Sequence, residues 1–330
     1  MHRSIPRHQS TSMRGSRPPE IGNGLSGSVS GHRDQNVTNY FKSMTFEEKV
    51  RSLAIKAFFT IDSLVNRIVL KGGNALDIVY GLTGRASIDL DFSLCNDFSE
   101  EEIPEIRIAI ERALEKSFEP EKLKTFDVKL EKKPQEDRIE CHSFWGGYYV
   151  TFKVTDIANY EKNKGNFEKI RREAIVVAPG QKKNFSIDIS KYEYCEKKVQ
   201  KKYDGFTIYV YSLEMLAFEK LRAICQQMVE YQDVIKKRRT PRARDFYDIY
   251  VIQNASNFDL SSNENMKLIQ NIFGCKKVPL SFLKLIKNYR DFHAAGYDEL
   301  KSTIKANEEV KPFDFYFDFV VDLVNKIPHI

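Results

Sequence analysis

The sequence holds few of the residues that build disulfide frameworks, zinc sites or membrane spans. It has five cysteines, and no two of them form a C-x-x-C pair, so we expect neither a disulfide framework nor a zinc site. Three of its six histidines fall within the first 32 residues and none pairs at ligand spacing, which argues against histidine-based catalysis. No apolar run approaches the roughly 20 residues that span a bilayer, and the N-terminus lacks the apolar core of a secretory signal. These absences predict a cytoplasmic protein with reduced thiols and no membrane partner.

What the sequence does hold is an ordinary globular balance with a mild excess of positive charge. Hydrophobic residues make up 42% of the chain and charged residues 30%, which is enough to build a sizeable core. The formal net charge is +6, and a mildly basic chain can bind a polyanion such as RNA. The sequence carries no signature of an RRM, a KH domain or a zinc finger, so an RNA partner has to be argued from the positions of the charges.

Three regions of the chain differ in composition. Residues 1–42 are rich in Ser, Gly, Arg, His and Pro with almost no apolar periodicity, so we interpret them as a disordered basic tail. Residues 43–210 mix strand and helix patterns, and residues 211–330 are helical in pattern throughout. The expected fold class is therefore α+β, with a sheet and flanking helices followed by a C-terminal helical domain.

Periodicity and capping signals place the individual elements. Thr45 with Glu48 forms a capping-box pattern at the start of the first helix, and Asn74 is expected to cap a helix over residues 75–80. Strands are expected at residues 67–70, 87–94, 125–131, 148–154, 185–189 and 206–210. Trp145-Gly146-Gly147 is interpreted as a turn into one of these strands. Further helices are expected at residues 100–118, 212–231, 243–255, 263–273, 280–289, 297–304 and 312–326.

Three carboxylates in two of these strands are the strongest chemical signal. Asp89 and Asp91 are two residues apart, so in a strand they share a face and lie about 6 to 7 Å apart. Asp188 also has apolar residues on both sides, and it would join them if its strand lay beside theirs. Carboxylates held in this way suit Mg²⁺ or Mn²⁺, and two such ions can stabilise a phosphoryl group under attack. Taken alone, an aspartate pair of this spacing is equally consistent with an exposed polar face.

The glycines that precede the aspartates strengthen the metal interpretation. Gly72, Gly73 and Asn74 lie between a short strand and a helix start, where the backbone can approach a phosphate closely and free N–H groups point at it. A simple tight turn would also explain two glycines. A glycine turn followed by Asp-Leu-Asp on the next strand, however, pairs an element that holds phosphates with one that holds metal ions.

Four segments together resemble the nucleotidyltransferase AbiEii/AbiGii toxin family, which belongs to the DNA polymerase β-like nucleotidyltransferase superfamily. In chain order they are KGGNAL (residues 71–76), GRASIDLDF (84–92), EKLRA (219–223) and RARDFYDI (242–249). The resemblance implies a polymerase-β-like nucleotidyltransferase sheet, an NTP substrate and a cognate antitoxin. Asn74 stands where the superfamily more often has Ser or Thr, which places one phosphate hydrogen bond in doubt, although an amide can donate one.

The resemblance also implies roles for individual residues. Asp89, Asp91 and Asp188 would be metal ligands, with Asp188 as the candidate base for the acceptor hydroxyl. Lys220 would contact the NTP phosphates, and Asp245 would be a second catalytic acid positioned by Arg244 or Asp248.

From the residues alone these later positions have simpler interpretations. Lys220 would be an exposed lysine on an amphipathic helix, and Arg244 with Asp248 an i, i+4 ion pair at a helix start. Arg85 could reach the triphosphate or shape the loop before the strand.

Two basic clusters are candidates for RNA binding, although charge runs of this kind also occur as solvated faces. We expect both to lie near the site, where they could neutralise a phosphodiester backbone. They consist of Lys197, Lys198, Lys201 and Lys202, and of Lys236, Lys237, Arg238, Arg239 and Arg242.

The resulting hypothesis is a metal-dependent enzyme that transfers a nucleoside monophosphate from an NTP to RNA. The family implies the 3′ end of tRNA as the acceptor, and a toxin of a toxin–antitoxin or phage-defence system as the biological role. Two alternatives stay open: transfer to a protein or small-molecule hydroxyl, and a nucleotide-binding regulator without catalysis.

Overall fold

The structure is a computed structural model of the whole chain, and it describes residues 44–82, 84–85, 87, 89–134, 143–177, 180–305 and 308–327. The tail expected at residues 1–42 lies outside the described residues. Met44–Ile330 form one compact unit.

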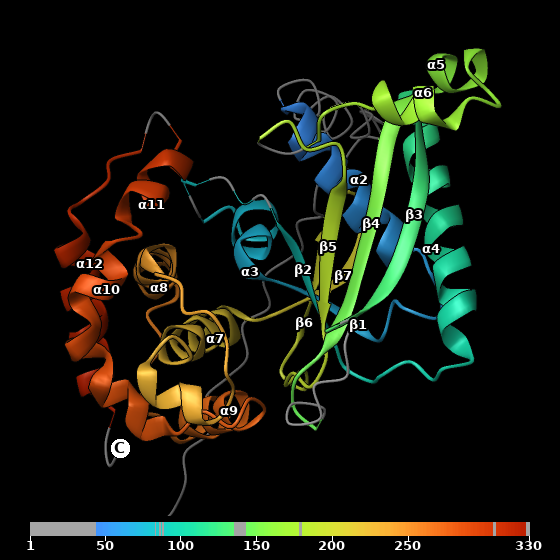
Figure 1. The fold of residues 1–330 in the computed structure, drawn as a ribbon. Coiled ribbons are helices and arrows are strands. Elements are labelled where there is room, and N and C mark those ends of the chain that lie inside the picture. Colours follow the sequence, from blue (N-terminus) through green and yellow to red (C-terminus); the bar gives the residue numbers. More distant parts are fainter. Residues whose placement is uncertain are drawn as a thin grey trace, which may run out of the picture. The chain divides into compact units, whose positions relative to one another are not determined.

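A mixed seven-stranded sheet dominates the first half of the described chain (Figure 1). Its strands are β1 (Ile68–Lys71), β2 (Leu90–Leu94), β3 (Leu123–Lys133), β4 (Gly147–Asp156), β5 (Phe185–Ser190), β6 (Val199–Tyr203) and β7 (Phe206–Val210). They lie side by side in the order β3-β4-β5-β2-β1-β7-β6. The strand β2 is therefore central, parallel to β5 on one side and antiparallel to β1 on the other.

The six strands expected from the sequence are confirmed, and one strand was missed. In β5 every second residue is buried, because Phe185, Ile187 and Ile189 point into the core while the residues between them do not. The missed strand β6 reads Val-Gln-Lys-Lys-Tyr and buries none of its residues. Among the described strands it pairs with β7 alone and lies at the edge of the sheet, where lysines discourage pairing with other chains.

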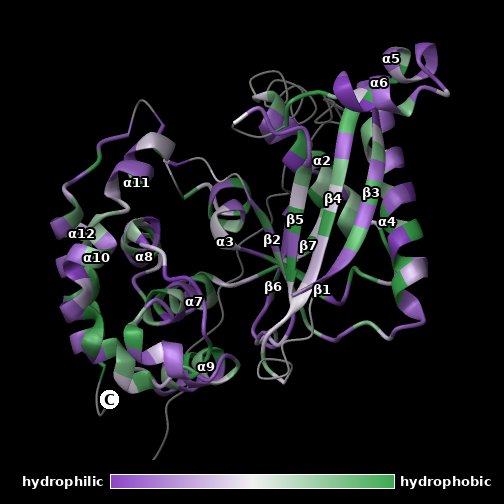
Figure 2. Cartoon of the chain, in the orientation of Figure 1, coloured by the Kyte–Doolittle hydropathy of each residue, from purple (hydrophilic) through white to green (hydrophobic). Residues whose placement is uncertain are grey.

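Two long helices pack on the sheet. The helix α2 (Phe46–Phe59) begins with the expected capping box, in which Thr45 and Glu48 bond each other's backbone amides. The helix α4 (Glu102–Phe118) buries Ile106, Ile110, Leu114 and Phe118 at helical spacing, and Figure 2 shows hydrophilic and hydrophobic residues alternating along it. Shorter helices are η2 (Glu119–Glu121), α5 (Ile157–Lys162) and α6 (Phe167–Arg172).

Helices make up the rest of the chain, as expected. They are α7 (Leu213–Cys225), η4 (Val229–Asp233), α8 (Ala243–Ser256), α9 (Asn263–Gly274), η5 (Leu280–Tyr289), α10 (Arg290–Ala294), α11 (Tyr297–Thr303) and α12 (Phe313–Asn325). Two expectations were only partly right. The helix expected over residues 212–231 ends at Cys225 and continues as the 3-10 turn η4, and residues 280–289 form the 3-10 segment η5. Within the described residues, no helix is long and apolar enough to cross a membrane.

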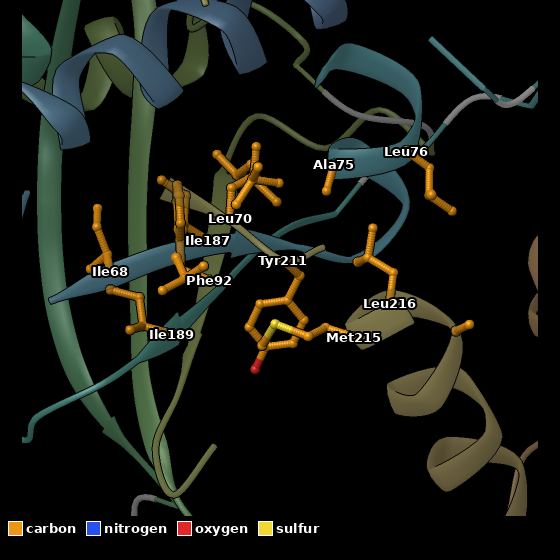
Figure 3. Packing of buried hydrophobic residues seen from close by; sticks show 14 of the residues in the cluster. Ile68, Leu70, Ala75, Leu76, Phe92, Ile187, Ile189, Tyr211, Met215 and Leu216 are labelled. Carbon is orange, nitrogen blue, oxygen red and sulfur yellow. The ribbon is translucent and has the colours of Figure 1, made fainter. Parts of the chain in front are cut away.

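One core contains buried apolar side chains of both halves, and a small second cluster is formed by Phe126, Ile170 and Ala174. Figure 3 shows Phe92 and Ile187 of the sheet in the same cluster as Tyr211 and Met215 at the start of the helical half. The Tyr211 hydroxyl lies 2.7 Å from Ser93 Oγ on β2, so the chain is anchored to the sheet where it enters α7. The α+β fold class is confirmed. The division into two domains after residue 210 stays a prediction, and its position coincides with the end of β7.

Candidate functional site

A tight glycine turn brings β1 against the aspartate strand. The chain leaves β1 at Lys71, and Gly72 adopts a positive φ of 71° at the start of the short helix α3 (Gly72–Asn74). A Cβ atom on Gly72 would lie 2.8 Å from Asp91 Oδ2, and one on Gly73 would lie 2.6 Å from Ser87 Oγ. Both glycines are therefore needed because the turn packs directly on Asp91 and on the loop before it.

Asn74 has a different role from the one expected. It is not a helix cap, because its backbone is already helical and its side chain makes no capping bond as α3 passes into the π-helix η1 (Ala75–Val79). Its fully buried amide nitrogen donates instead to the backbone oxygen of Asp89, at 2.5 Å. Asn74 thus ties the glycine turn to the aspartate loop, and its contact with a phosphate stays a prediction.

Asp91 and Asp188 lie on neighbouring strands, as the sequence suggested, but the expectation that Asp89 shares a strand with Asp91 is wrong. The strand β2 begins only at Leu90, so Asp89 is exposed in the loop just before it while Asp91 lies within it. Asp91 pairs in register with Lys71 of β1 on one side and with Asp188 of β5 on the other. The Asp188 carboxylate forms an ion pair with Lys133 of β3.

Asp91 lies in a crowded anionic environment. Burial raises the pKa of its carboxyl to about 7; Lys71 opposes the shift, and the carboxylates of Asp188, Glu219 and Asp89 add to it. Negative charge is therefore concentrated at the centre of the sheet.

Asp89, Asp91 and the two glycines border a cavity of about 560 Å³ between the sheet and α7 and α8. Six cationic and five carboxylate side chains are among its described lining residues, so it suits a ligand that carries several charges. The lining residues are Lys71, Gly72, Gly73, Arg85, Ser87, Asp89, Asp91, Glu219, Lys220, Arg222, Ala223, Gln226, Thr240, Pro241, Arg242, Ala243, Arg244, Asp245, Gly296 and Glu299.

Five of the residues singled out in the sequence form a buried aspartate cluster at this cavity: Arg85, Lys220, Arg242, Asp245 and Asp248. Lys220 Nζ lies 2.6 Å from Asp248 and 3.1 Å from Asp245. Arg85 binds Asp248 through two nitrogens at 2.7 and 2.5 Å, and Arg242 Nε lies 2.6 Å from Asp245. Lys220 is only 6% exposed, so the interpretation of it as an exposed lysine is wrong.

Electrostatic neighbours keep this cluster ionised. Burial disfavours the charged form of Lys220, but Asp248 and Asp245 still raise its pKa above the ordinary value. Burial likewise opposes ionisation of Asp248, and Arg85 and Lys220 outweigh it and hold that pKa well below its usual range.

The expected partners of Asp245 need correction. Arg244 pairs with Glu299 of α11, so the i, i+4 pair between Arg244 and Asp248 does not form. The cations that contact Asp245 are Lys220 and Arg242, because Lys220 and Asp245 face each other between α7 and α8 whereas Arg244 turns to Glu299 of α11.

A second buried cluster, the glutamate cluster, was missed in the sequence. It consists of Lys71, Glu193, Glu219, Arg222 and Lys276, three of which line the cavity. Lys71 Nζ lies 2.7 Å from Glu219 and 3.4 Å from Glu193, and Arg222 lies 2.8 Å from Glu193 and 3.5 Å from Glu219. Glu219 and Arg222 lie close to Lys220 on α7. Their nearness in sequence to this candidate site residue is the signal that could have identified them.

The two basic clusters lie in different places. Lys201 and Lys202 lie on the edge strand β6, separated from β2 by β7 and β1, and Lys197 pairs with Glu264 of α9. Lys198 Nζ donates to the backbone oxygen of Asn66. Arg242 is the member of the two clusters found among the described lining residues of the cavity.

Comparisons with known proteins place the chain in a family. Residues 54–318 match the model of the family described as nucleotidyl transferase AbiEii toxin, type IV toxin–antitoxin system, so the chain belongs to this family. Among solved structures, MenT4, a nucleotidyltransferase toxin from Mycobacterium tuberculosis H37Rv, matches with a TM-score of 0.43 and 14% identity over 86% of this chain and 84% of that one. No curated protein sequence matches. The chain is a nucleotidyltransferase toxin of a type IV toxin–antitoxin system, which implies a cognate antitoxin.

Proposed function

We propose that this AbiEii-family toxin uses the cavity to transfer a nucleoside monophosphate from an NTP to RNA, with the 3′ end of tRNA as the acceptor and a divalent cation as cofactor. The observation that carries the proposal is the position of Asp89 and Asp91, which face the same cavity as the glycine turn and the cations of both buried clusters.

The donor set at the sheet fits a hard divalent cation. Asp89 and Asp91 would hold it through carboxylate oxygens, the ligand type that Mg²⁺ prefers. Asp188, in register with Asp91, would be the third ligand once Lys133 leaves it. Among the described residues, no three His, Cys, Asp or Glu side chains are already arranged to enclose an ion, so binding requires this adjustment. When bound, the cation would neutralise charge that develops on the phosphoryl group.

The cations of the cavity account for triphosphate binding. Arg85, Lys220 and Arg242 line it and remain charged through their aspartate partners. Gly72 and Gly73 line the cavity and carry no side chain, so a phosphate can approach the backbone of the turn. We expect the triphosphate to lie between the glycine turn and Lys220, with its α-phosphorus towards Asp89 and Asp91.

The reaction is an in-line displacement. The acceptor hydroxyl oxygen bonds to the α-phosphorus, the bond to the bridging oxygen breaks, and pyrophosphate leaves. The hydroxyl proton passes to a carboxylate, for which Asp188 is the candidate. The protein contributes mainly position and charge, because phosphoryl transfer needs little covalent chemistry from the enzyme.

The direct test is to incubate the purified protein with total tRNA, Mg²⁺ and each α-³²P-labelled NTP in turn. We expect label on tRNA with one or more nucleotides, and its loss with EDTA or in Asp89→Asn, which removes one charge from an exposed position. Lys201→Gln on β6 is the matched control and should retain the activity. Label on a protein, or none with any NTP, would overturn the RNA acceptor.

A further inference from the structure

Aromatic rings and lysines from four separated segments form a surface beside the cavity. We call it the Trp145 surface and define it by Trp145, Tyr192, Lys191, Lys237 and Lys277. Lys277 belongs to it through the residue before Trp145, because its Nζ lies 4.3 Å from the centroid of the Phe144 ring. Trp145 precedes β4, Lys191 and Tyr192 follow β5, Lys237 follows η4 and Lys277 follows α9. The fold therefore assembles rings and cations that no sequence motif links.

The rings and the ammonium groups alternate. Lys237 Nζ lies 5.2 Å from the centroid of the Trp145 ring, and Lys191 Nζ lies 5.3 Å from that of Tyr192. The buried Lys276 lies 5.3 Å from the Trp145 ring and joins this surface to the glutamate cluster. Tyr192 is 37% exposed, so a flat ligand can contact its ring from solvent.

Lys237 and Lys277 carry charge without a local counter-charge. Among the described residues, no carboxylate lies within salt-bridge distance of either, whereas Lys191 pairs with Asp97 at 2.5 Å. Burial, together with the nearby Arg242 and Arg222, lowers the pKa of Lys237 to about 8. A polyanion at this position would relieve the repulsion among the three cations.

The Trp145 surface leads into the cavity. Lys276, beside the Trp145 ring, lies 3.5 Å from Glu193, and the other partners of Glu193, Lys71 and Arg222, both line the cavity. On the other side, Gly147 at the start of β4 pairs with Ser190, two residues beyond Asp188 on β5. An RNA segment that crosses Trp145 would therefore lie close to both the cavity and the strand that carries Asp188.

We propose that the Trp145 surface binds an unpaired segment of the acceptor RNA, with bases against Trp145 and Tyr192 and phosphates beside Lys237 and Lys277. Every base has a face that can stack on an aromatic ring, and lysines neutralise the backbone regardless of sequence. This inference rests on the proposed RNA acceptor. It moves the RNA-binding role from the cluster of Lys197, Lys198, Lys201 and Lys202 to a surface that adjoins the cavity through Lys276 and Glu193.

Trp145 is the only tryptophan of the chain, so its emission is a direct probe. We expect a single-stranded RNA oligonucleotide, added without NTP, to change this emission saturably, with an affinity that falls as salt rises. Lys277→Gln should lower the salt slope by about 0.7, the value for one phosphate contact on a single strand. Lys201→Gln on β6 should leave it unchanged. RNA that binds by a filter assay but leaves the emission constant, or an acidic polypeptide that alters it when RNA does not, overturns the proposal.

Steady-state kinetics separates this surface from the proposed reaction. Tyr192→Ala should raise KM for RNA about tenfold, as expected for the loss of one base–ring contact, with KM for the NTP unchanged. Phe167→Ala, which removes a 50% exposed ring on α6, is the control and should have no effect. Transfer to RNA with wild-type KM in Tyr192→Ala would reject the surface and keep the function. Absence of transfer to RNA in the wild-type protein would reject the proposed acceptor, and with it this surface.

Discussion

The two buried charge clusters contain the same number of charges but connect them differently. Each has three cations and two carboxylates, and both line the cavity. The aspartate cluster is a chain, in which Arg242, Asp245, Lys220, Asp248 and Arg85 follow one another. The glutamate cluster closes a ring, because Lys71 and Arg222 each contact both Glu193 and Glu219. In the ring, Lys71 and Arg222 each keep a carboxylate partner when either glutamate is lost, and Lys276, which pairs with Glu193, also donates to two backbone oxygens. The two arrangements should therefore respond unequally to the same kind of substitution.

We expect the largest effect from a substitution that interrupts the row of ion pairs in the aspartate cluster. Asp248→Asn removes the carboxylate shared by Arg85 and Lys220 at a fully buried position. We expect the free energy of unfolding to fall by about 5 kcal/mol, the upper end for a buried ion pair that loses one partner. Urea unfolding followed by circular dichroism measures it. A loss below about 1 kcal/mol would show that these charges are not interdependent.

The corresponding substitution in the glutamate cluster should lower the free energy of unfolding by less. In Glu193→Gln, Lys71 and Arg222 keep Glu219, and Lys276 keeps the backbone oxygens of Phe144 and Lys191. We expect a loss of about 3 kcal/mol by the same measurement. Equal losses in Glu193→Gln and Asp248→Asn would remove the distinction between ring and chain.

The pH dependence of stability probes Arg242, the last residue in the row of ion pairs of the aspartate cluster. The backbone N–H of Arg242 donates to Nδ1 of the buried His293, and burial lowers the pKa of His293 to about 4. In the unfolded protein, the pKa of a histidine is about 6.5. The free energy of unfolding therefore decreases as the pH falls from about 6.5 to about 4, and at pH 5 the decrease is about 2 kcal/mol. His293→Gln should lack this component. Parallel stability curves for the two proteins between pH 7 and pH 5 would contradict the assignment.

We expect the smallest effect at an exposed ion pair on the rim of the cavity. Arg244 pairs with Glu299, whose side chain is 65% exposed, so water screens the attraction. Glu299→Gln should change the free energy of unfolding by about 0.5 kcal/mol or less. A larger loss would mean that the rim is more rigid than its exposure indicates.

Local patterns predicted most of the fold, and their failures have physical causes. Alternation identified β5 because one face is buried, but β6 buries none of its residues and so shows no such pattern. Apolar spacing marked residues 280–289 as helical, but it did not separate a 3-10 repeat from an α-helical one. The sequence also did not decide the partner of the Asn74 side chain. The same amide group can cap a helix through its oxygen or donate to the backbone of Asp89 through its nitrogen.

The site could be predicted only where its residues are close in sequence or share a known pattern. Asp89 and Asp91 are two residues apart, and Asp188 was found by its similar surroundings. The glutamate cluster joins Lys71 to residues more than 120 positions away in the sequence. The residues next to Lys71 therefore do not predict the contact. The Trp145 surface was missed for the same reason, since Trp145 and Lys237 meet only after folding.

The space that Gly72 leaves beside Asp91 has a practical consequence for handling a toxin. One methyl group in Gly72→Ala would collide with the Asp91 carboxylate and strain a backbone with positive φ, yet it alters no charge and no surface side chain. Such a protein should be harmless to the cell that produces it while keeping the exterior of the active toxin. It would allow the folded protein to be produced in quantity, for which an aspartate substitution inside a crowded anionic centre would serve less well.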